Sequence, residues 1–430
     1  MITMVILLIL LILFVIIGVP LAFAIGASCV TYLVFTNPAL LMMVPQKLWT
    51  GSFSDLMIAM PLFMLAGDIM SSGGLTKRII SFCKQILRPI HGGLGEVNIV
   101  DSMIFGGISG SSVADTSALG SIIIPAMEAD GYPRKVAAGI TVASSTMGMI
   151  IPPSTPMIVY SMISGASVGA LFLAGAIPGI LVGVCQLAFV VFMSVKNHWH
   201  PAREKFNAKE FWRDILGGVP AILMPLFIIL VVSTGICTAS ESAGAAVFYA
   251  LIVGFFIYKE LTWKDVWEAV KNTFVSSASV MIIIGFTSIF TYILTMQGVP
   301  DQVGAFFANL AMPRWAIAIV FDIMILLIGC FIDVSPAILL LTPIMQPVLE
   351  AYGFSSLQFG AMLITGLAIG LCTPPVGMCL NVCNKIMKMP VIEIFKGAAP
   401  YLCCNVVVLI AISLWEPLTT GLPLLFGYSI

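Results

Sequence analysis

Long apolar runs, interrupted by short polar clusters, are the main pattern along the chain. The runs lack the strict alternation of apolar and polar residues that is typical of membrane-facing strands, so they predict helices. A helix that spans a bilayer needs about 20 apolar residues, and the chain has room for roughly nine to twelve such spans. The first run, 1–17, carries no charge, and the first basic residue is Lys47. Because a secretory signal needs a positively charged start, we expect this run to be a retained span.

The composition changes this picture little but excludes several classes of protein. Of 430 residues, 60% are hydrophobic and only 9% are charged, whereas soluble globular proteins carry about 25% charged residues. We therefore expect an all-α polytopic membrane protein. The 19 basic and 20 acidic residues nearly cancel, so no basic face predicts nucleic-acid binding. The ten cysteines form no Cys-x-x-Cys motif and the chain has no His-Glu-x-x-His motif, so we predict neither a transition-metal site nor an enzyme.

The charged residues divide the chain. Two windows, 196–214 and 259–271, hold 14 of the 39 charged residues and must lie outside the hydrocarbon. The first window is a charged central loop that separates a first repeat, 1–195, from a second, 215–430. Basic residues outnumber acidic ones in this loop, which places it in the cytoplasm by the positive-inside rule.

Both halves contain an amphipathic segment that is too polar to span a bilayer. These segments, 75–90 and about 261–274, predict helices that lie in the membrane interface. Both halves also contain a double proline, at 152–153 and at 374–375, at the end of an apolar run. The matching order of these features suggests that the halves repeat each other.

The spacing of polar residues supports the repeat. Asp115 precedes Pro125 by ten residues, and Asp333 precedes Pro343 by ten. Two halves with a broken apolar segment in the corresponding position indicate a secondary transporter and point to its binding site. The predicted elements are re-entrant hairpins at about 96–128 and 328–349 and broken helices at about 134–165 and 356–387.

The double prolines predict free backbone carbonyls. Pro152 has no N–H to give to the carbonyl of Gly148, and Pro374 has none for Gly370. A carbonyl freed in hydrocarbon costs several kcal/mol unless it is satisfied, and a dehydrated Na⁺ would satisfy it. The alternative is a proline-terminated helix whose carbonyls bond to neighbouring side chains or water. The hydroxyls beside the two breaks belong to Ser154 and Thr373.

The segment before each break predicts a hairpin tip. Residues 106–115 are rich in Gly and Ser and lie between apolar runs of only about a dozen residues, which is too short for a span. The corresponding segment of the second half is 329–336. An ionised Asp at bilayer depth costs about 2.5 to 3.5 kcal/mol, so Asp115 and Asp333 are candidate functional residues. Their alternative role is to cap the helices of the hairpin.

A family resemblance appears at these residues. The strings GSSVADTSALGSIIIP from Gly110, PPSTPMIVY from Pro152 and IGCFIDVSPAILLLTPIMQPV from Ile328 resemble the large membrane subunit of the tripartite ATP-independent periplasmic (TRAP) transporters. The string IGLCTPPVGMCLNV from Ile369 agrees. The Thr-Pro-Thr-Glu-Ala-Ala segment of the family is altered here to Thr-Ala-Ser-Glu-Ser-Ala from Thr238, which loses a proline but keeps the spacing of a helix capping box.

The resemblance implies an elevator-type, Na⁺-driven importer of organic carboxylates in a bacterial inner membrane, of the branch that carries sialic acid (N-acetylneuraminate). It implies two inverted repeats, a small four-helix membrane subunit and a periplasmic substrate-binding protein as partners, and no organic cofactor. The implied Na⁺ ligands are Ser111, Ser112 and Gly148 in the first half and Gly329, Asp333, Ser335, Gly370 and Thr373 in the second. The substrate is expected between the two tips, near Ser109, Gly110, Asp115, Pro152, Ser154 and Pro374.

Two other functions remain open at this point. A Na⁺/dicarboxylate symporter of similar hairpin architecture could work without a binding protein, and only the family motifs argue against it. A channel fits less well, because paired hairpins suit alternating access, and Na⁺-dependent uptake that saturates would separate the two.

Overall fold

The computed structural model describes residues 2–87, 93–197, 199, 208–310 and 312–429. Within these residues every regular element is a helix, which confirms the all-α class. The helices of the first half are α1 (Ile2–Ile16), α2 (Leu21–Thr36), η1 (Pro38–Met42), α3 (Met43–Gly51), α4 (Leu56–Ser72), α5 (Leu75–Leu87), α6 (Leu94–Ser109), α7 (Ser112–Ala129), α8 (Arg134–Ser145), α9 (Met147–Ile150), α10 (Thr155–Ser164) and α11 (Val168–Asn197). Those of the second half are α12 (Ala208–Ser233), α13 (Ala239–Ile252), η2 (Val253–Tyr258), α14 (Trp263–Met296), α15 (Val299–Asn309), α16 (Arg314–Gly329), α17 (Val334–Ala351), α18 (Ser356–Gly370), α19 (Met378–Met387), α20 (Val391–Leu414) and α21 (Pro417–Leu425).

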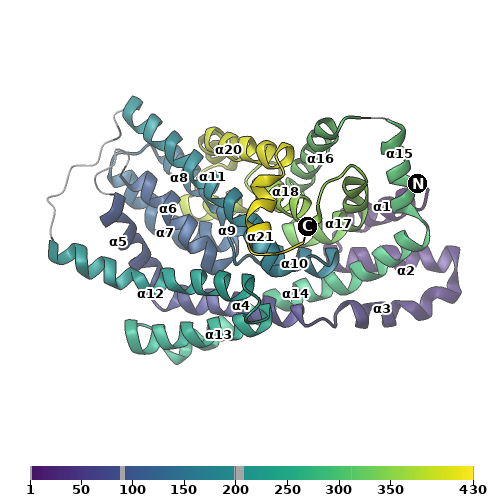
Figure 1. Ribbon diagram of the computed structural model, residues 1–430, viewed down its shortest axis with the longest axis horizontal. Helices are drawn as coiled ribbons and strands as arrows, with labels where there is room; N and C mark the ends of the chain where they lie inside the picture. Colours follow the sequence, from purple (N-terminus) through teal and green to yellow (C-terminus); the bar gives the residue numbers. More distant parts are fainter. Residues whose placement is uncertain (1, 88–92, 198, 200–207, 311, 430) are drawn as a thin grey trace.

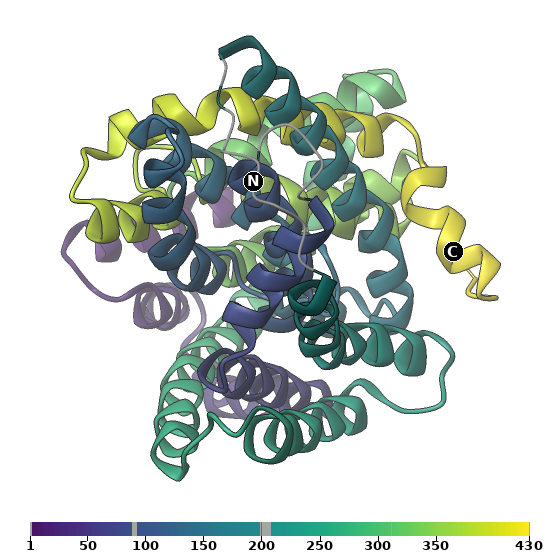
Figure 2. The same cartoon turned by 90° about the vertical axis from the view of Figure 1, so that its left-hand side faces the viewer.

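The helices form two groups. In Figure 1, α3, α4, α12, α13 and α14 form a layer along the lower side of the molecule, and the hairpins and broken helices lie above it, an arrangement that Figure 2 repeats from the side. Within the layer, α4 packs on α13, and α14 packs on α2, α3 and α4. The core lies in the upper group, where α18 is buried along its whole length from Leu357 to Gly370. A helix that is mainly apolar on every face, as α18 is, belongs in such a core.

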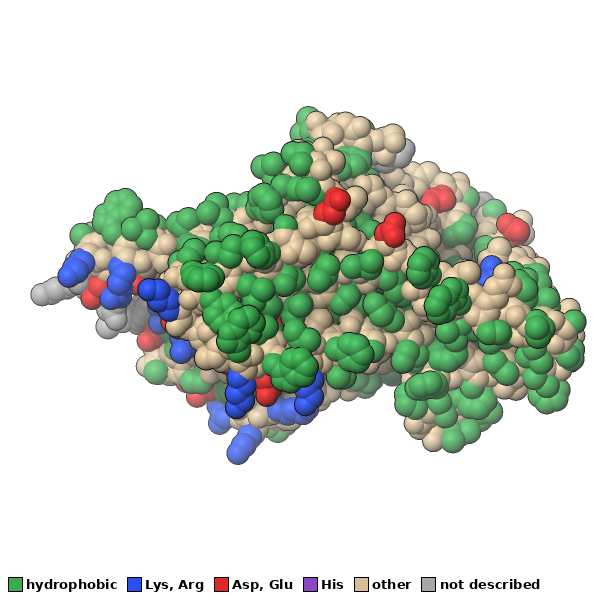
Figure 3. All heavy atoms as spheres, turned by 90° about the horizontal axis from the view of Figure 1, so that it is seen from below, with side chains coloured by type: hydrophobic (Ala, Val, Ile, Leu, Met, Phe, Trp, Pro, Cys, Tyr) green, Lys and Arg blue, Asp and Glu red, His purple; other side chains and the backbone are tan. Residues whose placement is uncertain are grey.

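In the part of the chain that the structure describes, fewer helices than predicted are long and apolar enough to span a membrane. Among the described residues, six helices are long and apolar enough to cross a bilayer, or up to eight if each bent pair counts as one span. The prediction of nine to twelve exceeds this number because part of the apolar length belongs to hairpin arms and broken helices. The first apolar run forms α1, which has only 15 residues and packs against α2. Hydrophobic side chains cover much of the surface, and Lys and Arg gather at the end where α12 begins (Figures 1 and 3).

The predicted interfacial segments have different outcomes. The first forms α5, which ends at Leu87, and residues 88–90 of the prediction lie outside the described residues. The second is the start of a longer helix, α14, and not a separate element. No proline interrupts α14 between Trp263 and Met296, so the helix continues into the apolar segment. The central window is shortened from both sides, because α11 extends to Asn197 and α12 begins at Ala208, and most of the residues between lie outside the described part.

The two halves match with a constant offset. Helices α7 and α17 both have 18 residues and begin at Ser112 and Val334, and α8 and α18 begin at Arg134 and Ser356. In both cases the offset is 222 residues. The same offset relates Gly148 to Gly370 and Pro152 to Pro374. The Pro-Pro peptide bond that follows is cis in both halves.

This offset corrects the register of the predicted repeat. Asp333 corresponds to Ser111, which likewise caps its helix, and Asp115 corresponds to Ala337. The prediction matched Pro125 to Pro343, but α17 also contains Pro347, which is the partner at the correct offset. The second hairpin is also longer than the predicted range 328–349, since its first arm, α16, starts at Arg314.

The two broken helices run antiparallel. The Tyr160 hydroxyl at the end of the first one donates to the Ser356 carbonyl at the start of the second, at 2.7 Å. The Arg134 guanidinium at the start of the first donates to the Met387 carbonyl at the end of the second. The second part of each also packs on the other half's hairpin, α10 on α17 and α19 on α7. This exchange joins the two repeats into one core.

Candidate functional site

The first hairpin tip lies against the first break with little space between the backbones. Gly110 follows the last residue of α6 and has φ of 60°, a left-handed conformation that favours glycine. A Cβ atom on Gly107 would lie 3.1 Å from the Pro152 carbonyl oxygen, and one on Gly106 would lie 2.8 Å from the Gly148 Cα. Glycine is therefore needed here for close backbone approach.

The second tip repeats this contact. The Val376 N–H donates to the Cys330 carbonyl across the tip and the break, at 3.2 Å. A Cβ atom on Gly370 would lie 2.5 Å from the Gly329 backbone. The structure thus brings each tip against the break of its own half.

The carbonyl that was predicted to be free at the second break already accepts a hydrogen bond. Pro374 gives no hydrogen bond to Gly370, but the Thr373 N–H bonds to the Gly370 carbonyl at 2.9 Å in a tighter turn. The prediction that the proline leaves this carbonyl without a donor was therefore wrong. The oxygen keeps its second lone pair, with which it could still bind a cation.

The first break differs. The Ile151 N–H bonds to the Met147 carbonyl at 2.8 Å, and the next two residues, Pro152 and Pro153, have no N–H. The Gly148 carbonyl therefore lacks both of its ordinary helical donors. This carbonyl is the one that the sequence argument describes correctly.

The hydroxyls beside the breaks bond to helix carbonyls. The Ser154 hydroxyl donates to the Met149 carbonyl at 2.5 Å, and the Thr373 hydroxyl donates to the Ile369 carbonyl at 2.9 Å. These bonds correspond to the alternative in which neighbouring side chains satisfy the helix end. They leave the hydroxyl oxygens as acceptors, which is the role that a cation ligand requires.

Asp115 is buried one turn into α7. One carboxyl oxygen accepts from the Ser102 hydroxyl at 2.9 Å, and Ser102 also bonds to Ser144 of α8 at 2.9 Å. Among the described residues no donor reaches the other carboxyl oxygen, nor the buried hydroxyl oxygen of Ser112 three residues earlier. Buried polar atoms normally have partners, so this pair is a candidate for cation binding in the first half.

Asp333 caps a helix, which is the alternative role considered for it in the sequence analysis. Its carboxylate accepts from the Val334 N–H at 2.8 Å and caps α17, and its side chain is exposed. Ser111 caps α7 in the same position, with a longer bond of 3.4 Å from the Ala114 N–H. Of the other predicted residues, Gly110, Gly148, Pro152, Ser154, Gly329 and Gly370 are buried, and Ser109, Ser335, Thr373 and Pro374 are half-buried.

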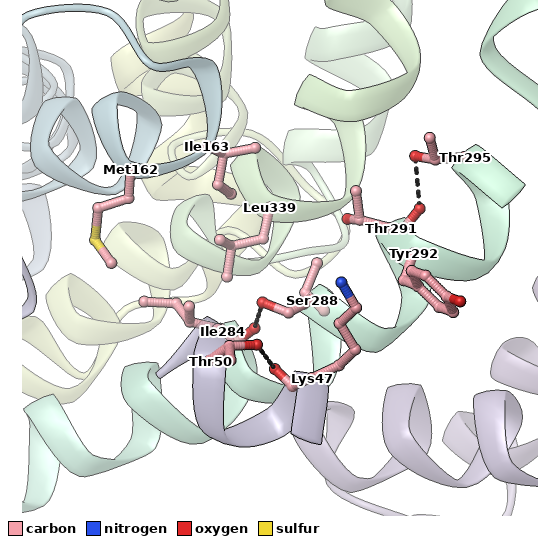
Figure 4. Close-up of a pocket in the computed structure, with 12 residues that line it drawn as sticks. Lys47, Thr50, Met162, Ile163, Ile284, Ser288, Thr291, Tyr292, Thr295 and Leu339 are labelled. Carbon is pink, nitrogen blue, oxygen red and sulfur yellow. Dashed lines mark hydrogen bonds between the residues drawn. The ribbon is translucent and has the colours of Figure 1, made fainter. Parts of the chain in front are cut away.

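A cavity of about 440 Å³ lies between the lower layer and the core. Figure 4 shows its lining: Lys47 and Thr50 from α3, Ile284, Ser288, Thr291, Tyr292 and Thr295 from α14, Met162 and Ile163 from α10, and Leu339 from α17. Among the described residues that line it, Lys47 alone is charged. The Lys47 ammonium lies 4.6 Å from the centre of the Tyr292 ring, a cation–π contact that holds it at the cavity.

Sequence reasoning missed this cavity. None of the predicted substrate-contacting residues lines it. A signal was present, because Thr287, Thr291 and Thr295 are four residues apart and form one polar stripe on α14. Lys47 is also the first charge in the chain, but nothing in the sequence places it beside α14.

Comparison with known proteins identifies the family. Residues 8–418 match the DctM component of the tripartite ATP-independent periplasmic transporters. The C4-dicarboxylate TRAP transporter large permease protein DctM of Rhodobacter capsulatus is 30% identical over 424 residues, with 95% of this chain and 96% of that protein covered. The sialic acid TRAP transporter large permease protein SiaM of Vibrio cholerae is 32% identical over 415 residues, with 96% of both chains covered. This chain belongs to the TRAP large permease family.

The fold has a match among solved structures. The crystal structure of the Alcanivorax borkumensis YdaH transporter superposes with a TM-score of 0.61 over 88% of both chains, at 15% identity. The fold of this TRAP permease is therefore that of a known membrane transporter.

Family membership fixes the general role of the chain. A TRAP large permease is a secondary transporter and not an enzyme, and it is a multi-pass protein of the bacterial inner membrane. The family implies association with a small membrane component and a periplasmic binding protein. Its members carry different substrates, as the names of the two relatives illustrate.

Proposed function

We propose that this TRAP permease imports an organic carboxylate together with Na⁺ by an elevator movement, and that the carboxylate is a sugar acid such as sialic acid. A periplasmic binding protein delivers the substrate, and a small four-helix membrane subunit completes the transporter. The observation that carries the proposal is the cavity at Lys47.

The cavity has the chemistry that a hydroxylated carboxylate needs. A single ammonium group supplies a counter-charge for one carboxylate, and the hydroxyls of Thr50, Ser288 and Thr291 suit the hydroxyl groups of a sugar acid. A volume of about 440 Å³ lies within the range of small-molecule sites, which is about 300–1,000 Å³. A dicarboxylate would leave most of these hydroxyls without a partner.

The tips support coupling to Na⁺. In the first half, the Gly148 carbonyl lacks its ordinary helical donors, and among the described residues no donor reaches the Ser112 hydroxyl oxygen or one of the two Asp115 carboxyl oxygens, so these atoms would act as hard oxygen ligands. In the second half, Asp333 lies at the hairpin tip and Gly370 lies at the break that packs against this tip. Na⁺ ions bound there would stabilise the core in a state that accepts an anion.

The position of the cavity supports the elevator. Its walls come from α3 and α14 of the layer on one side and from α10 and α17 of the core on the other. A substrate held there would contact both groups, and a shift of the core along the layer would expose it to the opposite side of the membrane.

Reconstitution tests the proposal. The permease and its small subunit are placed in liposomes, and uptake of N-acetylneuraminate and of succinate is measured with and without a Na⁺ gradient and the binding protein. We expect saturable uptake of the sugar acid that requires both. Uptake that is indifferent to the binding protein and to Na⁺ would contradict the proposal and favour another mode of transport.

Lys47 variants test the cavity. Lys47→Met should reduce uptake at least about tenfold, since the loss of one charge-assisted contact costs roughly 1.5–3 kcal/mol. Lys271→Met is the matched control, because Lys271 is an exposed lysine of α14 that does not line the cavity. Equal uptake by the two variants would remove the cavity from the transport path.

A further inference from the structure

Two buried amide side chains meet beside the first break. Gln186 of α11 donates to the side-chain oxygen of Asn405 of α20 at 2.7 Å, and both residues are 0% exposed. Gln186 also donates to the Ala143 carbonyl at 3.1 Å. Asn405 donates to the Thr146 hydroxyl at 2.8 Å and to the Ala143 carbonyl at 3.4 Å. Both amides therefore bond to the end of α8.

This end of α8 leads directly into the predicted ion site. Thr146 is the single residue between α8 and α9, and Gly148 lies two residues after it. The Thr146 hydroxyl donates to the Ala143 carbonyl at 2.7 Å, so the same two groups that the amides hold are also bonded to each other. Any shift of this joint would move the Gly148 carbonyl relative to the tip at Ser111 and Ser112.

The contact has no counterpart in the second half. At the offset of 222 residues, Gln186 corresponds to Val408 and Asn405 to Gly183, which cannot form such bonds. The second broken helix has its own buried amide, Gln358, which bonds to the Ile412 and Ser413 carbonyls at 2.9 and 3.2 Å. Gln358 lies at the start of α18, far along the helix from Gly370.

Polar side chains are costly in a membrane core and are usually placed there for function. We propose that Gln186 and Asn405 are positioning residues that fix the α8–α9 joint and thereby hold the Gly148 carbonyl in place for a bound Na⁺. They contact the backbone and Thr146 and not the ion. Their effect resembles that of outer-shell groups, which orient the ligands of a metal site.

The test compares Asn405→Leu and Gln186→Met with Gln358→Met in the reconstituted transporter. Gln358→Met removes a buried amide with two carbonyl bonds, so it controls for the general loss of a buried polar contact. We expect the half-saturating Na⁺ concentration to rise by roughly tenfold in the first two variants and to stay unchanged in the control. The KM for the organic substrate at saturating Na⁺ should stay unchanged in all three. An unchanged Na⁺ requirement in both Asn405→Leu and Gln186→Met, or a rise of the same size in Gln358→Met, would overturn the proposal.

The inference rests on the proposed Na⁺ coupling. A second measurement therefore separates a failure of the positioning role from a failure of the proposed function. If uptake by the unsubstituted protein proves independent of Na⁺, the proposed function fails. Amide hydrogen exchange in residues 141–151 then tests the contacts of Gln186 and Asn405 by themselves. The backbone amides of a loosened α8–α9 joint exchange faster whatever ion is coupled to transport. Faster exchange in Asn405→Leu than in Gln358→Met would support the positioning role, and equal exchange would contradict it.

Discussion

The two hairpin tips differ in length, burial and charge. In the first half the turn has two residues, Gly110 and Ser111, and packs into the core beside Gly148. In the second half it has four, from Cys330 to Asp333, and its Phe331 side chain is 63% exposed. In both halves a glycine before the tip nevertheless lies against the glycine of the break, Gly106 against Gly148 and Gly329 against Gly370. The shared motif is therefore one of backbone geometry, and each half places different side chains on it.

This difference predicts two unequal cation sites. The first has a buried carboxyl one turn behind the tip, at Asp115, and serine hydroxyls around it. The second has its carboxylate at the exposed tip, at Asp333, where it also caps a helix. Loss of the glycine contact should therefore destabilise whichever half it is made in. Loss of a side chain should affect only the cation site to which that side chain belongs.

The largest effect is expected from Gly370→Ala. Its Cβ would lie 2.5 Å from backbone atoms of Gly329, which cannot move aside as a side chain can. We expect a loss of at least about 1–3 kcal/mol of stability, as for other overpacked cores, seen as a lower Tm and a lower yield of folded protein. Gly148→Ala should be milder, because its nearest contact would be 3.1 Å away. Gly244→Ala is the control, with open space around its Cβ position. A wild-type Tm for Gly370→Ala would refute the close contact.

The next largest effect concerns Asp115, which has no counterpart in the second half. Asp115→Ala should lower Na⁺-dependent uptake at least about tenfold, equivalent to about 1.4 kcal/mol. The Tm should not fall, because removing a buried carboxyl also removes a cost of about 2.5–3.5 kcal/mol. Asp322→Ala is the control, since Asp322 is a buried carboxyl of α16 that accepts from Ser413 at 3.0 Å. If Asp115→Ala instead loses stability and keeps its Na⁺ dependence, Asp115 serves the fold only.

A smaller effect is expected at the second tip, where capping and ion binding can be separated. Asp333→Ala removes the cap of α17 and should cost about 1 kcal/mol, whereas Asp333→Ser keeps a capping oxygen and removes the charge. We expect both variants to express and both to show a weakened Na⁺ dependence of uptake, as should Thr373→Ala. Full recovery of Na⁺ dependence in Asp333→Ser would show that Asp333 acts only as a cap.

The same comparison explains which features could be predicted from the sequence. Local chemistry was sufficient for the hairpin at α6 and α7 and for the broken helix from Arg134 to Ser164, because glycine, serine and proline act on their own backbone. Local chemistry was insufficient for the register of the repeat. Pro343 and Pro347 lie one turn apart in α17, and only the helix boundaries show that Pro347 is the partner of Pro125.

The cavity and the contact between Gln186 and Asn405 could not be predicted from the sequence, for a different reason. Lys47 and Ser288 come from distant parts of the chain, and they meet only because Gly51 of α3 packs closely on α14. Gln186 and Asn405 likewise lie on long, mainly apolar helices, and the sequence does not show which residues they contact. Tertiary contacts between distant helices decide both features.

The smallest effect is expected within the first tip, between two neighbouring serines. Ser111→Ala removes a long capping bond of 3.4 Å and should cost less than the usual value of about 1 kcal/mol. Ser112→Ala removes a buried hydroxyl whose oxygen has no partner among the described residues, so its Tm should stay the same or rise. If Ser112 binds Na⁺, the half-saturating Na⁺ concentration rises in Ser112→Ala although no hydrogen bond within the protein has been lost. A variant with unchanged Na⁺ affinity and a lower Tm would instead show that this hydroxyl stabilises the start of α7, which would leave Asp115 and the Gly148 carbonyl to form the first site without it.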